Sequence, residues 1–279
     1  MTDSVHAIDA AAIGEPGCAT HTYLMRSIRP FVRDPFAQFA EARGNKPGSQ
    51  DPLAGAPAFN FLTGEGGFAQ VFTNGLTGLR WRADRVHLDP MLPPQLGSGV
   101  TLTGLHWHGR TFDVAVGPDE TTVTETAGQP FMVEAPDGTH LVSGGSPLTL
   151  KTRRPDLAPT DDVARCRPAQ ASSEEPGMYA EAAVDGSRAT VWAPDATSGS
   201  LVVDLGKRTR VARITPRWTD ALPSTYQVLT SLDGTSWSEA PPADPNGVLQ
   251  HPVNARYVRV DLTHAPDAPR TGLRELEVA

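Results

Sequence analysis

The chain has 279 residues, including 26 glycines and 26 prolines but no repeat period or low-complexity tract, so it can form two or more ordinary domains with many turns. The formal net charge of −8 supplies no basic field that would hold nucleic acid or anionic lipid. No apolar run reaches about eighteen residues, so no transmembrane helix is predicted.

The first part of the chain has helical periodicity. Apolar and small residues recur at helical spacing over residues 3–13, and Gly14 and Pro16 end that pattern. A second helix is predicted over residues 19–28, before Pro30. The N-terminus has no basic stretch followed by an apolar core, so no signal peptide is predicted.

The next segment ends in a carboxylate at the start of a long loop. Phe36, Phe39 and the alternating alanines predict a short helical or turn-like segment that ends in Glu41. A loop of about fifteen residues follows, and loops of that length inside a compact domain are usually functional or disordered. Glu41 is therefore either a functional carboxylate or a solvated residue at a helix end.

A further helix start is predicted after this loop. Thr63 has the side chain of an N-cap, and apolar residues at roughly helical spacing predict a helix over residues 67–79. The start of this helix would lie next to Glu65 and to the loop that bears Glu41.

The segments PFAQFAEAR and FNFLTGEGGFAQVFTNGLTGLRW, followed by a DP-x-LPP strand start, resemble the end of the catalytic domain in glycoside hydrolase family 65. That family includes acid trehalases and α-glucobiose hydrolases and phosphorylases, with an (α/α)6 barrel and a small C-terminal β-sandwich. The resemblance makes Glu41 the candidate general base, with Ala40 where the family often has Ser. It makes Thr63 and Glu65 candidate substrate-binding residues.

An inverting glycosidase needs a second carboxyl group, about 6.5–9.5 Å from the base, to protonate the leaving oxygen. In the family this acid lies on the barrel, well upstream of the base. The acids that precede Glu41 here match no such motif: Asp3, Asp9, Glu15 and Asp34. The resemblance therefore implies half of a catalytic pair, no catalytic cofactor, and a chain that is inactive by itself.

The predicted helices are too few to close a barrel of twelve. Their apolar faces would then lack partners, and exposed apolar area of this kind favours association. Another chain could supply the rest of the barrel. The alternative is a small helical hairpin that packs on the domain that follows.

From residue 83 the periodicity changes to short alternating runs separated by Gly, Pro and Asp-Gly turns, which predicts antiparallel strands up to residue 153. This small β-sandwich resembles the C-terminal sandwich of family 65, where it would brace the barrel. Residues 154–165 have the composition of a linker. Because Cys18 and Cys166 fall in different predicted domains, we expect no disulfide and no metal site from them.

The last part, residues 166–279, contains the motifs AAVDGSRATVW, LVVDLGK, YQVLTSLDGTSW, ARYVRV and LRELEV. In this order they resemble a discoidin-like domain of the coagulation factor five/eight type C fold, which includes carbohydrate-binding module family 32. The residue pattern agrees, because VVDL and YVRVDL alternate like strands and LDGT is typical of a hairpin turn.

The resemblance to the discoidin-like family implies a structural Ca²⁺ ion, and hard cations prefer oxygen ligands. The matching side chains are those of Asp185, Thr190 and Glu275. Further candidates are the backbone carbonyls of Ala182 and Ser187. The alternative is a plain turn at Asp185 and an exposed strand position for Glu275.

Modules of this family hold sugars in shallow loop sites with an aromatic platform. The candidates here are Trp218 and Tyr179, in predicted loops, together with Arg217. The alternative is that these aromatic side chains are packed in the core, as large aromatic residues often are.

The predicted fold class is thus multidomain: a partial all-α region over residues 1–82, which resembles a fragment of an (α/α)6 barrel, followed by two all-β domains. The all-β domains are the small β-sandwich over 83–153 and, after the linker, a discoidin-like β-sandwich jelly roll over 166–279.

The expected function is that of the C-terminal portion of an inverting, trehalase-like α-glucoside hydrolase with a glycan-binding module. Its expected partners are trehalose or a related α-glucobiose and a glycan. The alternatives are a non-catalytic carbohydrate-binding protein, a truncated gene product, or an interaction protein that docks on another chain. The resemblance implies an extracellular location, whereas the missing signal peptide predicts a cytoplasmic one if Met1 is the true start.

Overall fold

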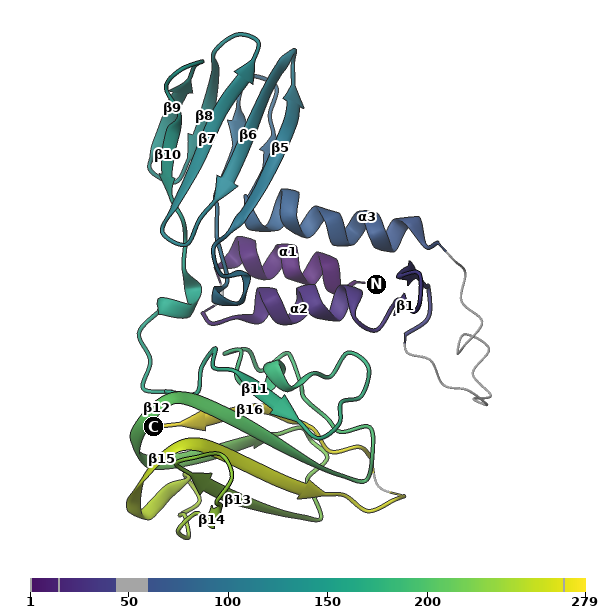
Figure 1. The fold of residues 1–279 in the computed structure, drawn as a ribbon, viewed down its shortest axis with the longest axis vertical. Coiled ribbons are helices and arrows are strands. Elements are labelled where there is room, and N and C mark those ends of the chain that lie inside the picture. Colours follow the sequence, from purple (N-terminus) through teal and green to yellow (C-terminus); the bar gives the residue numbers. More distant parts are fainter. Residues whose placement is uncertain (1, 15, 44–59, 268) are drawn as a thin grey trace. The chain divides into compact units, whose positions relative to one another are not determined.

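The computed structural model describes residues 2–14, 16–43, 60–267 and 269–279 (Figure 1). The chain forms two compact units. Unit 1 comprises Met1–Glu15 and Tyr23–Leu157, and unit 2 comprises Pro16–Thr22 and Ala158–Ala279. The short segment 16–22 therefore belongs to unit 2, although its neighbours in sequence on both sides belong to unit 1.

The helices are α1 (Asp3–Ile13), α2 (Ala19–Ile28) and α3 (Leu62–Gln70), and a π-helical segment, η1 (Val71–Leu76), continues α3. The strands of unit 1 are β1 (Val32–Arg33), β2 (Gln38–Phe39), β3 (Arg80–Trp81), β4 (Val86–His87), β5 (Val100–Trp107), β6 (Arg110–Val116), β7 (Glu120–Ala127), β8 (Phe131–Ala135), β9 (Gly138–Val142) and β10 (Leu148–Lys151). The strands of unit 2 are β11 (Ala169–Ala171), β12 (Ser198–Trp218), β13 (Thr225–Ser231), β14 (Ser238–Glu239), β15 (Val248–Thr263) and β16 (Leu273–Val278).

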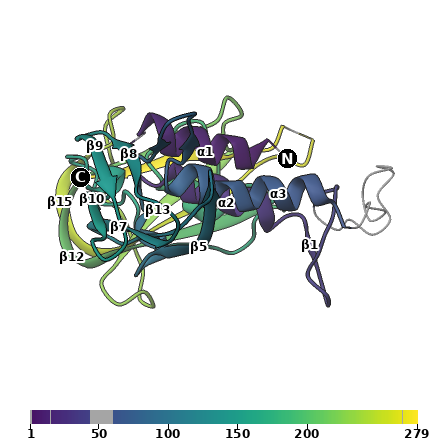
Figure 2. The ribbon, with the colours of Figure 1, turned by 90° about the horizontal axis from the view of Figure 1, so that it is seen from above.

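The two helices predicted at the start of the chain are confirmed as α1 and α2. Gly14 ends α1 in the left-handed conformation, with φ of 67°, which glycine adopts without a steric penalty. Helices α1 and α3 lie side by side (Figure 2). They approach closely where a Cβ atom on Gly67 would lie 2.8 Å from Ser4 Oγ. Buried apolar side chains, centred on Ala7 and Val71, hold this helical part together.

The helical option for the segment before Glu41 is wrong, and the turn-like option is correct. Strands β1 and β2 form a hairpin in which Val32 pairs with Phe39. Phe39 is buried, whereas Phe36 at the turn is 80 % exposed. Proline disfavours helical backbone in the residue before it, so Pro35 favours a turn over a helix here despite the helical spacing of the phenylalanines.

The start of α3 also differs from the prediction. The helix begins at Leu62 with Phe61 as its N-cap residue, so Thr63 lies inside the first turn and does not cap it. The carbonyl of Phe61 accepts hydrogen bonds from the backbone amides of Gly64 and Glu65 (3.0 and 3.2 Å). Backbone hydrogen bonding therefore sets the helix start, with no contribution from the threonine side chain.

The β-sandwich predicted after the helices is confirmed. One four-stranded sheet has the order β10-β7-β6-β5, and the other has the order β3-β4-β8-β9. The alternating strands direct apolar side chains into a shared core, which includes Leu88, Phe112, Val114, Val123 and Val133.

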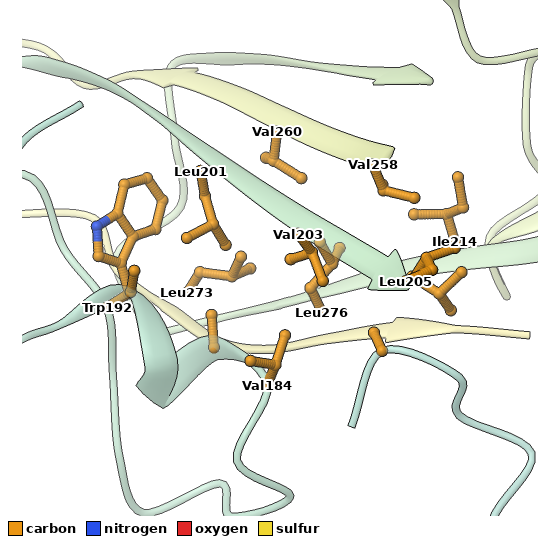
Figure 3. Close-up of a cluster of buried hydrophobic side chains, with 14 of the residues drawn as sticks. Val184, Trp192, Leu201, Val203, Leu205, Ile214, Val258, Val260, Leu273 and Leu276 are labelled. Atoms are coloured by element: carbon orange, nitrogen blue, oxygen red, sulfur yellow. The ribbon is translucent and has the colours of Figure 1, made fainter. Parts of the chain in front are cut away.

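Unit 2 is a second β-structure, built around the long strand β12. A six-stranded sheet has the order β11-β12-β15-β13-β14, and β16 pairs with the far end of β12. The core lies against β12 and β15 and is shown in Figure 3; its largest side chain, Trp192, is fully buried. The predicted hairpin turn at LDGT is confirmed, because it connects β13 to β14.

The expectation that the cysteines stay unpaired is wrong, because Cys18 and Cys166 form a disulfide. Both residues belong to unit 2, because segment 16–22, which includes the first turn of α2, packs there, while the chain on either side of it belongs to unit 1. The predicted linker also contributes to this unit: Ala164 is fully buried, and the Val163 amide donates a hydrogen bond to the Val278 carbonyl (2.7 Å).

Candidate cation site and candidate glycan groove

Oxygen atoms from the predicted cation ligands converge on one point of unit 2. The hydroxyl of Thr190 lies 2.8 and 3.0 Å from the two carboxylate oxygens of Asp185. It also lies 3.1 Å from the carbonyl oxygen of Ser187 and 3.4 Å from that of Ala182. A hydroxyl has only one hydrogen to donate, so it cannot satisfy all of these acceptors at once. Converging oxygen acceptors of this kind are what a hard cation binds.

Glu275 brings a second carboxylate to this loop from strand β16. Its side chain is buried, and Oε1 accepts a 3.3 Å hydrogen bond from the Gly186 amide. Within the described part of the chain, Oε2 has no hydrogen-bond partner. Burial, followed by repulsion from Asp185 and Asp162, raises the pKa of Glu275 to about 9. A buried carboxyl group with one unpaired oxygen is well suited to bind a cation, which would favour its ionised form.

The donor set indicates which cation would fit. Across the described ranges, no three His, Cys, Asp or Glu side chains are grouped as metal ligands. A cation beside Asp185 and Glu275 would therefore depend on hydroxyl and carbonyl oxygens for the rest of its shell. Such a mixed oxygen set fits Ca²⁺, whereas Zn²⁺ prefers nitrogen and sulfur ligands.

The sequence analysis missed Asp162, which lies beside this loop. Its carboxylate accepts hydrogen bonds from the amides of Ala164 (3.0 Å) and Val278 (2.9 Å), while burial raises its pKa. A cavity of about 350 Å³ is lined by residues that include Asp162 and Glu275. The residue escaped notice because the polar composition of TDDVAR is typical of a linker.

A groove of about 570 Å³ is lined by the end of β12 and by β13, and it contains the candidate sugar platform Trp218. Trp218 is the last residue of β12 and not part of a loop, which corrects the prediction. Its ring meets that of Tyr226 edge to face, with the centroids 5.2 Å apart. The groove is also lined by Glu239, Asp244 and a run of prolines: Pro241, Pro242 and Pro245.

The other two sugar-binding candidates do not line this groove. Tyr179 is only 5 % exposed. Arg217 pairs with Glu277, with its Nε and Nη2 atoms 3.2 and 2.9 Å from the carboxylate oxygens. Tyr226 takes their place beside Trp218, and the sequence analysis missed it because YQVLTS was read only as a strand. The alternation of side chains along that strand could have placed Tyr226 on an exposed face.

A second hollow in unit 2 lies among the loops that follow β12 and β15. Its volume is about 450 Å³, and its lining includes Asp220, Arg270 and Arg274 around a largely apolar floor. Arg270 forms an ion pair with Glu175, and Arg274 Nη1 donates a 2.9 Å hydrogen bond to the carbonyl of Arg188. These arginines are therefore held in place by the protein itself.

In unit 1, the structure places the candidate base near the start of α3. A backbone hydrogen bond from the Phe61 amide to the Phe39 carbonyl (2.9 Å) holds the helix start beside the end of β2, two residues before Glu41. Glu41 and Thr63 are exposed, and Glu65 is half-buried in the first helical turn. The loop predicted to follow Glu41 lies mainly in 44–59, outside the described residues.

Two family models match the chain, one in each unit. Residues 79–142 match the C-terminal domain of glycosyl hydrolase family 65, and residues 168–276 match the F5/8 type C domain.

No helix in the described part of the chain has both the length and the apolar composition to cross a membrane.

The chain is similar to several curated proteins. It is 28 % identical over 265 residues to a cell wall acid trehalase of Candida albicans, which covers 85 % of this chain and 24 % of that protein. It is 27 % identical over 316 residues to an acid trehalase of Emericella nidulans, which covers 100 % of this chain and 28 % of that protein. The chain therefore spans about a quarter of the length of these relatives.

Among solved structures, the chain is similar to chitosan-binding module 1 from a chitosanase/glucanase of Paenibacillus sp. IK-5. The identity is 30 % and the TM-score is 0.37, and the likeness covers 43 % of this chain and 99 % of that one.

Proposed function

We propose that this chain is the C-terminal portion of an inverting α-glucoside hydrolase of trehalase type, and that unit 2 binds a glycan. The matches to a glycosyl hydrolase family 65 C-terminal domain and to an F5/8 type C domain support this proposal. The names of the relatives support trehalose or a related α-linked glucobiose as substrate. The observation that carries the glycan-binding part is the groove formed by Trp218 and Tyr226.

The groove has the chemistry that sugar recognition needs. Aromatic rings offer apolar surface for the C–H faces of a pyranose ring, and Tyr226 is 53 % exposed. Glu239 and Asp244 line the same groove and place carboxylate acceptors within reach of sugar hydroxyl groups. Apolar surface with a few convergent polar groups is typical of small-ligand sites.

Calorimetric titration of the chain with trehalose, other α-linked glucobioses and longer glucans tests this assignment. We expect Trp218→Ala to weaken the affinity by about ten-fold, because one desolvated aromatic contact is worth on the order of 1–2 kcal/mol. Trp81→Ala is the matched control, since Trp81 is 46 % exposed and belongs to unit 1. Equal losses in both variants, or no binding by the unmodified chain, would contradict the groove assignment.

The hydrolytic part of the proposal assigns Glu41 the role of general base. In this role its carboxylate takes a proton from the attacking water while an acid across the sugar protonates the leaving oxygen. This requires a family 65 barrel to supply the acid. The isolated chain is therefore expected to release no glucose from trehalose, and turnover by it would contradict this division of roles.

In an enzyme that combines this chain with such a barrel, Glu41→Gln should lower kcat by about 10²–10⁴-fold and leave substrate affinity nearly unchanged. The amide keeps the size of the side chain but cannot accept the proton. Glu120→Gln is the matched control, because Glu120 is an exposed carboxylate on β7 of the same unit with no proposed role, and it should leave kcat unchanged. An unchanged kcat for Glu41→Gln would remove this residue from the mechanism.

The barrel would dock against the helical part of unit 1. Large apolar side chains there are exposed: Val5 and Ile13 on α1, Leu62 on α3, and Phe36 in the β1–β2 turn, at 54–80 %. Exposed apolar residues on neighbouring elements are typical of an interaction surface. The fourfold greater length of the relatives supports a barrel as the partner.

We also propose a structural Ca²⁺ ion in unit 2. The side chains of Asp185, Thr190 and Glu275 would hold it together with the carbonyl groups of Ala182 and Ser187. When bound, the ion would neutralise buried negative charge and tie β16 to the loop. Ca²⁺ at a hundred-fold excess over Kd should raise the free energy of unfolding by about 2.7 kcal/mol. The thermal melt should therefore occur at a higher temperature with Ca²⁺ than with chelator. An unchanged melt would count against the ion.

The disulfide and the relatives both support an extracellular location. Disulfides such as Cys18–Cys166 persist in oxidising compartments and are rare in the cytosol. Relatives of the chain are named as cell wall, periplasmic or secreted acid trehalases. Fractionation of cells that express the natural gene tests the location, and retention in the cytosol with free thiols would contradict it.

A further inference from the structure

Segment 16–22, called the strap below, is buried against unit 2. Cys18, Ala19, Thr20 and Thr22 are each at most 3 % exposed. The disulfide joins the strap to Cys166, which is 148 residues away in sequence. The strap is thus an integral part of a unit that is otherwise built from residues 158–279.

The two half-cystines hold consecutive residues of the cation loop. The Cys18 amide donates a hydrogen bond to the Asp185 carbonyl, and the Cys166 amide donates one to the Val184 carbonyl, both at 2.6 Å. The disulfide connects these two donors covalently. A single disulfide therefore joins the two residues that hydrogen-bond to the backbone at 184–185.

Two glycines allow the strap and the loop to come this close. A Cβ atom on Gly17 would lie 2.1 Å from the Asp185 carbonyl oxygen, and one on Gly186 would lie 2.8 Å from that of Pro16. Both glycines have positive φ, +105° and +83°. Other residues would meet both a steric clash and backbone strain here, so the contact is specific to this pair of glycines.

We propose that the strap and its disulfide are a positioning device for the cation site: they hold residues 184–186 so that the Asp185 carboxylate faces Thr190 and Glu275 before any cation arrives. This inference rests on the proposed Ca²⁺ site. A loop that is ordered before binding loses less conformational entropy when the ligand binds, so its affinity is higher. Glu275 comes from a strand, so the loop at Asp185 is the part whose order the strap sets.

The first test compares Ca²⁺ affinity, by calorimetric titration of the chelator-treated full chain, before and after removal of the cross-link. We expect the double variant Cys18→Ser, Cys166→Ser to bind Ca²⁺ at least about ten-fold more weakly. Its affinity for trehalose should not change, because the lining of the Trp218 groove includes no residue of the strap. A loss of both affinities would indicate general damage to the unit and would overturn the specific positioning role.

A second variant leaves both cysteines in place. Gly17→Ala should also weaken Ca²⁺ binding, since the new methyl group pushes on the Asp185 carbonyl. Gly234→Ala is the matched control: Gly234 has a similar positive φ of +76° in the same unit, but its nearest neighbour would lie 3.4 Å away. Equal effects of the two alanines would overturn the proposal, because backbone strain alone would then explain both.

The outcomes separate the two proposals. No Ca²⁺ binding by the unmodified chain would reject the cation site and the positioning role with it. Binding of unchanged strength in both the cysteine variant and Gly17→Ala would reject the positioning role alone. If the cysteine variant does not fold, hydrogen exchange in the Gly17→Ala chain decides: faster exchange confined to 182–190 supports the proposal, and unchanged exchange there overturns it.

Discussion

Glu275 in unit 2 and Glu41 in unit 1 occupy opposite kinds of surroundings. Glu275 on β16 is buried beside Asp185, at a site whose oxygen atoms come from segments far apart in sequence. Glu41 is exposed, next to a helix start, and its proposed chemistry needs a proton donor from a barrel. Unit 2 thus presents a candidate binding site formed by its own residues, whereas the catalytic role proposed for unit 1 depends on a barrel. The cation site is identified by the burial of Glu275 and by oxygen atoms that converge on one point. The site around Glu41 would need residues from a partner.

Removal of the disulfide should give the largest difference in stability between the two units. In the chain-entropy account, a cross-link over 148 residues stabilises the folded state by up to about 5 kcal/mol. The double variant Cys18→Ser, Cys166→Ser should therefore lower the stability of unit 2, while unit 1 is expected to lose much less. Hydrogen exchange measured separately for each unit checks this, and equal losses would show that the units unfold together.

Glu275→Gln tests the buried carboxyl group. The folded chain retains the Glu275 proton up to about pH 9, whereas the unfolded chain releases it near the ordinary value of 4.5. Since the folded state binds more protons in that window, the stability of the cation-free protein falls as the pH rises through it. The glutamine variant avoids this loss and should be more stable at pH 7 by on the order of 3 kcal/mol.

The advantage of Glu275→Gln should vanish near pH 4, where both folded and unfolded chains are protonated at this position. Urea unfolding of both proteins at pH 4 and pH 7, in the presence of chelator, measures the difference. The variant should also lose the stabilisation that Ca²⁺ gives to the unmodified chain. The same stability difference at both pH values would contradict the buried, protonated state.

Asp204 provides a surface carboxylate for comparison within unit 2. Hydrogen bonds from Arg256, 2.9 and 3.0 Å long, lower its pKa. A lowered pKa stabilises the fold above the unfolded value near 3.8, and this contribution is lost as the pH falls through the folded value. Asp204→Asn should therefore cost about 0.2–1 kcal/mol at pH 7, typical of an exposed pair, and little below pH ~3. A larger cost at pH 3 than at pH 7 would contradict the sign of this shift.

Glu41→Gln should have the smallest effect on stability. An exposed side chain outside the core usually changes the free energy of unfolding by less than about 0.5 kcal/mol. Urea unfolding of the variant chain measures this directly. A loss above 1–2 kcal/mol, on the order expected for a buried polar group, would mean that Glu41 has a structural role and would erase its contrast with Glu275.

Local patterns in the sequence predicted much of this fold. The 3.6-residue period gave α1 and α2, and the two-residue period gave the strands of both β-structures. The family resemblance of the motif around Asp185 supplied the candidate cation ligands, and the structure places several of them within one loop. Of these, Thr190 now lies within hydrogen-bonding distance of the others in that loop.

The failures concern features that the spacing of residues in the sequence does not decide. Phe36 and Phe39 have helical spacing, yet proline at 35 and pairing with β1 produce a hairpin. The disulfide partner of Cys18 could not be inferred from spacing, because the strap packs with a unit that begins more than a hundred residues later. Tyr226 contacts Trp218 because the fold brings β13 and the end of β12 to the same groove.

The position of the strap within the sequence bears on how this module could be transferred between proteins. A gene fragment that encodes residues 158–279 is continuous and matches the F5/8 type C region, yet it omits seven residues of its own unit. Such a graft would carry Cys166 as an unpaired thiol and would lack the strap that contacts the loop at Asp185. Transfer of this module as an intact block therefore requires the strap to be transferred with it.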